Sequence, residues 1–239
     1  LLRTVVDDPI NHAVVILHQI KAVTADLVLI NGVPINGMEN GKVYWSNWSG
    51  LSDVSQFIQV QRGWGASALG ISSVGGTMNM VTKSTEAQKG GSAYFGIGND
   101  GFRKYSVSFS TGLMDNGWAI TFMGALNTGD GYVKGTNYEG WTYFGNISKV
   151  INDHHKLSLT AFGAPQWHNQ RSTMHYIEDY KNSPDGGRFN NGYGYINGEA
   201  VGSGYGYNYY HKPQVSLNHY WTIDDKSTLT TSLYGSMAT

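Results

Sequence analysis

From residue 92 onward, apolar and small polar residues alternate along the chain, and this period of two most constrains the fold. In 102–111, Tyr105, Val107 and Phe109 share one face, while lysine and serine occupy the positions between them. Successive side chains of a strand point to opposite faces, so the pattern predicts two-faced strands. It recurs in 118–126, 141–149, 156–162, 215–221 and 228–234. Counting the hairpin that begins at residue 92, about seven antiparallel strands of roughly 9–11 residues fit before the end of the chain.

The connections between these strands alternate in length. Tight turns are expected at 114–117, 152–154 and 224–226, and longer connections at 127–140 and 165–213. Only the turn at 99–101 breaks the alternation. Short turns at one end and long loops at the other are typical of outer-membrane β-barrels, whose short turns face the periplasm. The sequence therefore predicts a long extracellular loop over 165–213.

Composition agrees with a membrane barrel. Charged residues make up 14% of the chain, against about 25% in soluble domains, beside 32 Gly, 16 Tyr and 7 Trp. The net charge of −1 suggests no nucleic-acid partner, and the absence of cysteine excludes a disulfide framework. No apolar run approaches the roughly 20 residues of a spanning helix. No leader peptide is recognisable at Leu1, so we expect that one was removed or that the chain begins inside a longer protein.

Residues before 89 follow a different pattern. Short strands are expected at 25–31, 57–61 and 77–82, with a turn over 32–36 that carries Pro34. Segments of this length between turn formers predict a small mixed α+β domain. We therefore expect domains over 1–89 and 90–239.

Three ordered motifs lie in this first domain. They are VLINGVP at 28–34, IQVQRG at 58–63 and GGTMNMVTK at 75–83. Together they resemble the plug domain of TonB-dependent outer-membrane receptors. The segment 37–50 and the start of the barrel are similar to the Bacteroidetes-type versions of these receptors.

The resemblance implies a fold and a function. Barrels of this family have 22 strands around a plugged lumen, so the chain is expected to be partial: a plug followed by the first strands of the wall. Such receptors lie in the outer membrane of Gram-negative bacteria and bind a scarce nutrient: a ferric chelate, haem, cobalamin, glycan or peptide. Import then depends on the TonB energy-transducing complex, and in some cases on a surface lipoprotein partner. No cofactor is implied.

The N-terminus departs from the family pattern. Neither an energy-coupling box nor the early [IV]-R-G-[FM] element is found, and 6–25 does not continue the family's pattern after 1–5. The N-terminal part of the plug is therefore expected to be missing or altered.

The motifs supply candidate structural and gating residues. These are Gly32, Pro34, Arg62, Gly63, Gly75, Gly76, Asn79 and Lys83, with Gly65 and Gly70 between the motifs. The glycines either permit rearrangement of the plug or only satisfy its turns. Arg62 and Lys83 either pair with carboxylates on the inner wall or are solvated in a wet lumen.

Aromatic residues supply candidate substrate contacts. Tyr44, Trp45 and Trp48 lie between the first two motifs and offer stacking surfaces, or else pack against the wall. Additional candidates in the long loop are Trp167, His168, His175 and Tyr176. The Gly/Tyr run over 191–210 is typical of a binding loop or of an interface belt. His168, His175, Glu178 and Asp179 match no defined metal spacing, so no metal site is predicted.

Two other classes of function compete with the receptor. A surface adhesin would use the Gly/Tyr run without energy-dependent uptake. A soluble carbohydrate-binding or hydrolytic domain would need a carboxylate pair across a groove, and Glu178 and Asp179 are adjacent in sequence. No nucleophile elbow, phosphate-binding loop, zinc-protease motif or dinucleotide fingerprint occurs, so no enzymatic activity is predicted.

Overall fold

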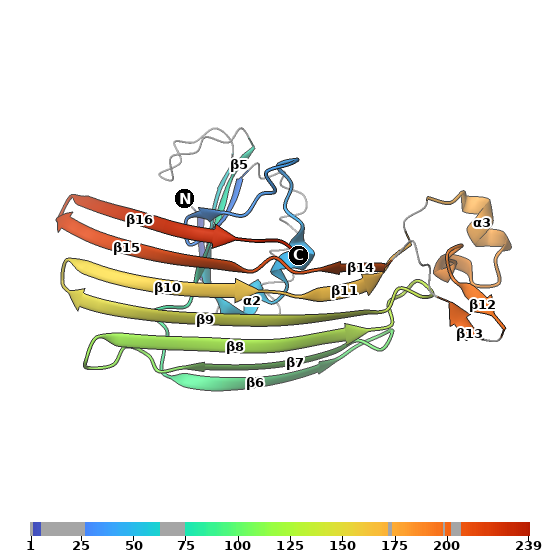
Figure 1. Ribbon diagram of the computed structural model, residues 1–239, viewed down its shortest axis with the longest axis horizontal. Helices are drawn as coiled ribbons and strands as arrows, with labels where there is room; N and C mark the ends of the chain where they lie inside the picture. The colour runs from blue at the N-terminus through green and yellow to red at the C-terminus, as the bar shows by residue number, and fades with distance from the viewer. Residues whose placement is uncertain (1, 6–26, 63–74, 172–173, 198, 202–206) are drawn as a thin grey trace.

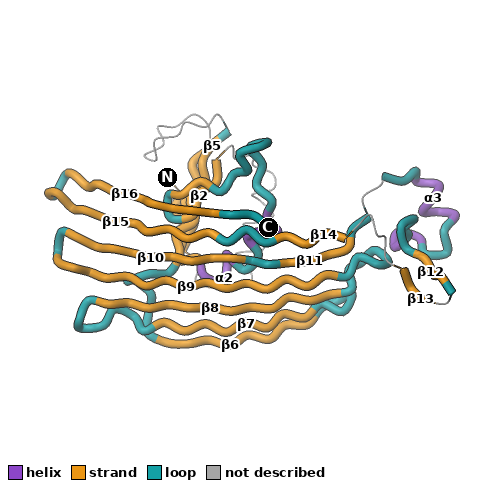
Figure 2. The backbone as a smooth tube through the Cα atoms, viewed as in Figure 1, coloured by secondary structure: helices purple, strands orange, loops and turns teal. Residues whose placement is uncertain are grey.

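The computed structural model describes residues 2–5, 27–62, 75–171, 174–197, 199–201 and 207–239. Two main sheets dominate this part of the chain, one of five strands and one of nine (Figure 1). Helical segments are short and sparse (Figure 2). Among the described residues, no helix is long and apolar enough to cross a membrane.

The five-stranded sheet forms the first body, which we call the plug. In spatial order its strands are β1 (Leu2–Val5), β4 (Ser55–Arg62), β5 (Gly76–Thr82), β2 (Leu27–Ile30) and β3 (Val33–Pro34). β2 runs parallel to β5, and the remaining pairs are antiparallel. All four residues of β2 are buried, as expected for an apolar run that is covered on both faces.

The turn between β2 and β3 corrects one expectation. It consists of Asn31 and Gly32, with φ angles of 51° and 82°, whereas 32–36 was the expected turn. An Asn-Gly pair with two positive φ angles suits the tight hairpin turn that matches strand twist. Pro34 instead lies in β3, opposite Leu29. β3 is an edge strand, where a residue without an N–H is tolerated.

The nine-stranded sheet is the second body, which we call the wall. Its long strands are β6 (Gly90–Ile97), β7 (Arg103–Ser110), β8 (Trp118–Gly129), β9 (Tyr138–Asn152), β10 (His155–Gly163), β15 (Gln214–Asp224) and β16 (Ser227–Ser236). Each pairs antiparallel with the next, which confirms the expected antiparallel wall. Short turns join the strands at one end, and longer connections lie at the other end (Figure 1).

The region 165–213, expected to be one loop, has structure of its own. β11 (Gln166–Asn169) pairs with β9 and with β14 (Tyr207–Tyr210), so both extend the wall. Beyond them lie α3 (Ile177–Asn182), η2 (Gly186–Arg188), β12 (Gly194–Ile196) and β13 (Glu199–Val201). An ion pair of 2.7 Å between Arg188 and Asp100, and one of 2.5 Å between Lys134 and Asp185, hold this outer part on neighbouring connections.

The two faces of the wall differ in chemistry. Exposed outward-facing residues include Tyr105, Val107, Phe109, Ile120, Phe122, Ile147, Leu159, Val215 and Leu217. Buried inward-facing residues are mostly small and polar: Thr121, Thr142, Asn146, Ser148, Ser158, Thr160, Ser216 and Asn218. Apolar outside and polar inside is the reverse of a soluble sheet and is typical of a lipid-facing wall.

Aromatic residues mark both margins of the outward face. Near the short turns, the Lys149 ammonium lies 5.1 Å from the ring centre of Trp118. Toward the long connections, Trp141 is exposed and lies opposite Leu126. The eight steps between the nine residues from Trp118 to Leu126 span about 26 Å along the strand, or about 20 Å along the membrane normal when the strand is tilted, close to the ~25 Å apolar band of membrane barrels.

The plug and the wall share one hydrophobic core. The segments η1 (Trp45–Trp48) and α2 (Leu51–Val54) supply apolar plug side chains to this core. Trp48, Leu51, Ile58 and Met80 from the plug join Met123, Phe144, Phe162 and Ala164 from the wall. The plug therefore covers the inner face of the wall around Met123, Phe144 and Phe162.

Candidate functional site

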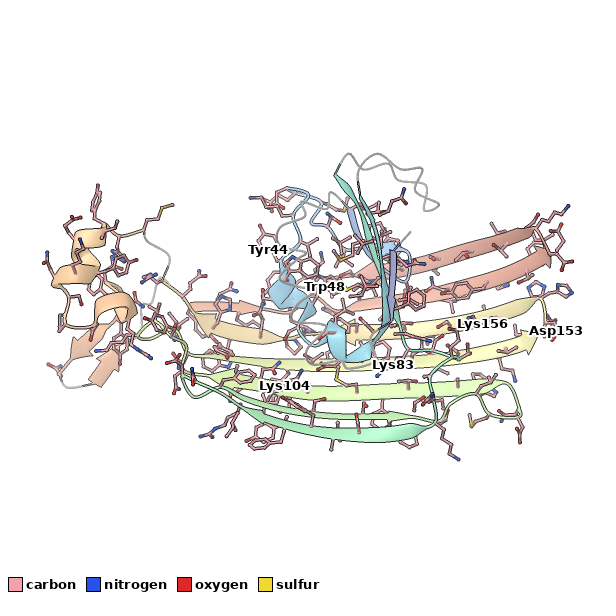
Figure 3. All side chains as sticks on the ribbon, turned by 180° about the vertical axis from the view of Figure 1, so that it is seen from behind. Tyr44, Trp48, Lys83, Lys104, Asp153 and Lys156 are labelled. Atoms are coloured by element: carbon pink, nitrogen blue, oxygen red, sulfur yellow. The ribbon has the colours of Figure 1, made fainter. Side chains whose placement is uncertain are left out.

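The segment 35–50, which leads from β3 through η1, carries the first aromatic candidates. Figure 3 shows Tyr44 and Trp48 on the side of the plug sheet toward the long connections. Tyr44 is exposed, and its hydroxyl accepts a 2.8 Å hydrogen bond from the Asn40 amide. Trp45 is half-buried against the shared core. Among the aromatic side chains of this segment, the phenol of Tyr44 is thus the one that is exposed and free to meet a ligand.

Trp48 is packed against the wall. Its side chain is 4% exposed and stacks on Phe162 with ring centres 5.8 Å apart and an interplanar angle of 19°. Of the two roles weighed for Trp48, its burial favours wall packing over substrate contact. The ring fixes the plug segment on β10.

A small cavity of about 190 Å³, which we call the apical hollow, opens beside this segment. Lys42, Tyr44 and Asn47 line it from the plug, and Tyr210 and Lys212 line it from the wall. Ligand pockets commonly measure about 300–1,000 Å³. In this conformation the apical hollow therefore accommodates only part of a larger ligand.

The two candidates of β11 point to opposite faces. Gln166 faces inward, because its amide donates a 3.2 Å hydrogen bond to the Asn47 side chain of the plug. Trp167 consequently faces outward, where its ring stacks on Tyr207 with centres 6.2 Å apart. His168 returns to the inner face. Trp167 therefore suits the aromatic margin of the membrane better than a substrate site.

The structure does not bring His175 and Tyr176 to the apical hollow, because α3 lies far from η1 (Figure 1). The His175 ring packs edge-on against Phe189 at 5.2 Å. Tyr176 is 82% exposed. No group of three or more His, Cys, Asp or Glu side chains within the described ranges is arranged to hold a metal ion.

The motif residues of the plug have mainly structural contacts. The backbone N–H of Gly32 donates to the Asn79 side chain at 3.0 Å, and the Asn79 amide donates to Gln59 at 3.1 Å. Asn79 therefore holds the β2–β3 turn on β4 and β5.

The remaining motif residues lie at the ends of β4 and β5. Gly76 begins β5 opposite Arg62, directly after Gly75. Only the backbone of Arg62 is described, and Gly63, Gly65 and Gly70 lie outside the described residues. Their expected gating roles stay predictions.

Among the described wall residues, no carboxylate pairs with Lys83. Its ammonium donates at 3.2 Å to the backbone carbonyl of Asp53, at the end of α2. In the ion pair that joins plug and wall, the plug supplies the carboxylate and the wall the cation, the reverse of the expectation for Lys83. The Asp53 carboxylate lies 2.8 Å from the Lys104 ammonium of β7. Lys104 was assigned to the polar face of 102–111 by its alternation with serines, but the sequence did not identify its partner.

Further polar contacts join the plug to the wall. The Thr142 hydroxyl donates at 2.9 Å to the carbonyl of Ser49, and the Asn218 amide donates at 3.2 Å to the carbonyl of Asn31. Both acceptors are backbone atoms. No side-chain pattern could therefore have revealed these contacts.

Known proteins share this arrangement of a plug against a wall of strands. No family model matches the chain. Among solved structures, the open form of the ferric-catecholate import receptor Fiu from E. coli aligns with a TM-score of 0.65 at 16% identity, over 90% of this chain and 32% of that one. The fold is that of a TonB-dependent outer-membrane receptor. The siderophore receptor PiuA from Acinetobacter baumannii aligns with a TM-score of 0.63 at 15% identity, over 89% of this chain and 29% of that one.

A curated relative agrees with the receptor fold. The vitamin B12 transporter BtuB of Photobacterium profundum is 27% identical over 146 residues, which cover 57% of this chain and 23% of the relative. The chain thus spans about a quarter to a third of the length of these TonB-dependent receptors. The predicted plug and barrel architecture is confirmed, and the narrower Bacteroidetes-type resemblance stays a prediction.

Proposed function

We propose that this chain contributes the plug and the first wall strands of an outer-membrane receptor that binds a scarce nutrient and imports it with energy from a TonB complex. The division falls between the two sheets, with 1–89 as the plug and 90–239 as the N-terminal part of the wall. A plug segment that is seated on the inner wall beside a small opening, which accommodates part of a ligand, supports binding and gating rather than covalent chemistry. The single observation that carries the proposal is the apical hollow beside this seat.

The lining of the apical hollow suggests the cargo class. Lys42 and Lys212 place two ammonium groups there against the single carboxylate of Glu39. Tyr44 and Tyr210 add flat surfaces that suit aromatic or planar groups. An anionic chelate with planar groups matches this chemistry, and ferric catecholates belong to that class. Haem, cobalamin, glycan and peptide remain in the test panel.

An uptake assay tests the function. The complete gene that encodes this chain is expressed in a Gram-negative strain that lacks its own iron and cobalamin receptors. Cells then receive radiolabelled ferric catecholate, ferric citrate, haem, cobalamin, an oligosaccharide or a peptide, with or without a protonophore. We expect at least a tenfold rise in accumulation of one probe over the empty vector, abolished by the protonophore. Accumulation that ignores the protonophore, or none with any probe, would contradict energy-coupled import.

Variants of the apical hollow test the binding site. Tyr44→Ala removes the exposed ring, and we expect the KM of uptake to rise about tenfold while the amount of receptor in the outer-membrane fraction stays constant. Tyr44→Phe keeps the ring and is expected to change KM less than threefold. Equal effects of the two changes would show that the hydroxyl, not the stacking surface, meets the ligand. A surface adhesin would bind without any of this uptake.

A further inference from the structure

The boundary between plug and wall has two unlike sides. We call the boundary along the inner faces of β9, β10, β11 and β15 the packed seam. We call the other boundary the open seam. On its plug side lie residues 53–56 and 83–89. On its wall side lie the inner faces of β6 and β7, together with Thr121 and Met123 of β8. The difference between them bears on where cargo passes the plug.

The packed seam is dense. Trp48 stacks on Phe162, and the Ser49 and Asn31 carbonyls accept hydrogen bonds from wall side chains. A buried group of wall residues bonds within itself: the Asn146 amide donates to Ser158 and to Thr160, each at 2.8 Å. Ser148 completes this group through Asn146 and Ser158. These four polar side chains are buried and have their hydrogen-bond partners inside the sheet.

The open seam holds a cavity of about 500 Å³. Its wall side carries hydroxyl groups from Ser92, Ser108, Ser110 and Thr121. Its plug side carries Asp53, Lys83, Glu86 and Lys89, two groups of each sign. A hydroxyl-rich lining with balanced charge suits a hydrated polar solute of either sign. The volume falls within the range of ligand pockets.

One ion pair closes this cavity toward the long connections. Lys104 lies four residues before Ser108 on the same face of β7, about 13 Å further along the strand. Both oxygens of the Asp53 carboxylate lie within 2.9 Å of its ammonium. Asp53 also lines the cavity. Separation of this pair would therefore open the cavity toward the outer side without disturbing the packed seam.

We propose that, among the wall strands of this chain, cargo passes the plug along the open seam, with the Asp53–Lys104 ion pair as its closure and the packed seam as the fixed side. This inference rests on the proposed import function and specifies which boundary opens. It also names the lining: hydroxyl groups of β6, β7 and β8 opposite the 83–89 connection.

Two cross-linked variants test the proposal in cells. Asp53→Cys/Lys104→Cys ties the open seam, and Asn47→Cys/Gln166→Cys, whose native side chains meet at 3.2 Å, ties the packed seam. The chain has no cysteine of its own. Because the lysine side chain spans much of the gap, both variants are linked with a bis-methanethiosulfonate, which joins each thiol through a disulfide with loss of methanesulfinate and is cleaved by a reductant, rather than by a direct disulfide. Each variant is its own control, measured before linking, after linking and after cleavage.

Uptake of radio-iron-labelled ferric catecholate and radio-cobalt-labelled cobalamin is the readout, with surface binding measured in parallel. Linking the open seam is expected to lower uptake at least tenfold, with recovery on cleavage and unchanged surface binding. Linking the packed seam is expected to change uptake less than twofold. Block by the packed-seam link alone, by both links or by neither would overturn the proposal. If the unlinked wild type shows no energy-dependent uptake, the import function itself fails, and that result is separately visible.

Discussion

The open seam and the packed seam belong to the same wall, with the same alternation of inward polar and outward apolar residues, yet the plug meets them differently. Along the packed seam, the Trp48 ring and the backbone carbonyls of Ser49 and Asn31 contact the wall strands. Along the open seam one ion pair does so above a cavity. The tightness of the plug boundary therefore depends on which plug side chains reach the wall and on the position of the strand in the sheet, since β6 is an edge strand and is exposed along its length.

The largest expected difference between the seams comes from Trp48→Ala. Removal of a buried ring from a shared core costs about 3–5 kcal/mol, so we expect a loss of that order in the free energy of plug unfolding. Urea titration of the purified receptor in detergent, followed by proteolysis of the released plug, measures it. The matched control is Tyr44→Ala, which removes an exposed ring from the same segment and is expected to cost less than about 1 kcal/mol. Equal costs would show that Trp48 does not anchor the plug.

The alternation of residues predicted the wall well because lipid on one side and the plug on the other impose period two on each long strand. Short apolar segments between turn formers likewise predicted the plug strands at 25–31, 57–61 and 77–82, which the structure has at 27–30, 55–62 and 76–82. The short strands β11 and β14 were missed, because QWHN and YNYY are too brief and too polar to be separated from a loop.

The site was less predictable than the fold. The sequence groups Tyr44, Trp45 and Trp48 as equivalent aromatic candidates, but in the structure Tyr44 is exposed and Trp48 is buried. The burial of Trp48 depends on β10, which is more than 100 residues away in the sequence. The sequence does not identify Asp53, since nothing local marks it as the partner of Lys104. Contacts between a plug and a wall are long-range, and a single sequence carries no record of them.

Gly50→Ala is expected to show the second-largest effect. Gly50 has a φ of +77°, and a Cβ there would lie 2.7 Å from the Thr142 side chain of β9. Backbone strain and overpacking together are expected to cost about 2–4 kcal/mol. Gly41→Ala is the control, because Gly41 has a φ of +68° but no atom near a new Cβ. The difference in unfolding free energy between the two variants isolates the contact with the packed seam, and no difference would contradict it.

Ser158→Ala tests the hydrogen-bonded group under the packed seam. The change leaves the buried Asn146 amide and Ser148 hydroxyl each without one partner. We expect a loss of about 1–2 kcal/mol in thermal or urea unfolding. Ser92→Ala removes a hydroxyl from the open seam, where the Ser92–Ser108 contact is solvent-exposed, and is expected to stay within about 0.5 kcal/mol. A larger cost for Ser92→Ala would reverse the ranking of the two seams.

The smallest effect is expected at the ion pair of the open seam. Asp53→Asn, Lys104→Gln and their combination form a double-mutant cycle. The two side chains are 16% and 22% exposed, so the coupling energy should be near 1 kcal/mol, between the values of exposed and buried pairs. Urea unfolding of the four proteins at two salt concentrations measures it.

The dependence on salt concentration distinguishes the Asp53–Lys104 ion pair from the neutral contacts of the packed seam. Raising ionic strength from about 0.1 M to about 1 M shortens the screening length from about 10 Å to about 3 Å, so the Asp53–Lys104 coupling should fall. The neutral hydrogen bond from Thr142 to the Ser49 carbonyl, removed by Thr142→Val, should cost the same at both concentrations. A weak closure that salt loosens is what an opening boundary requires. A coupling of several kcal/mol that ignores salt would instead make Asp53–Lys104 a permanent anchor and would move the candidate passage away from β7.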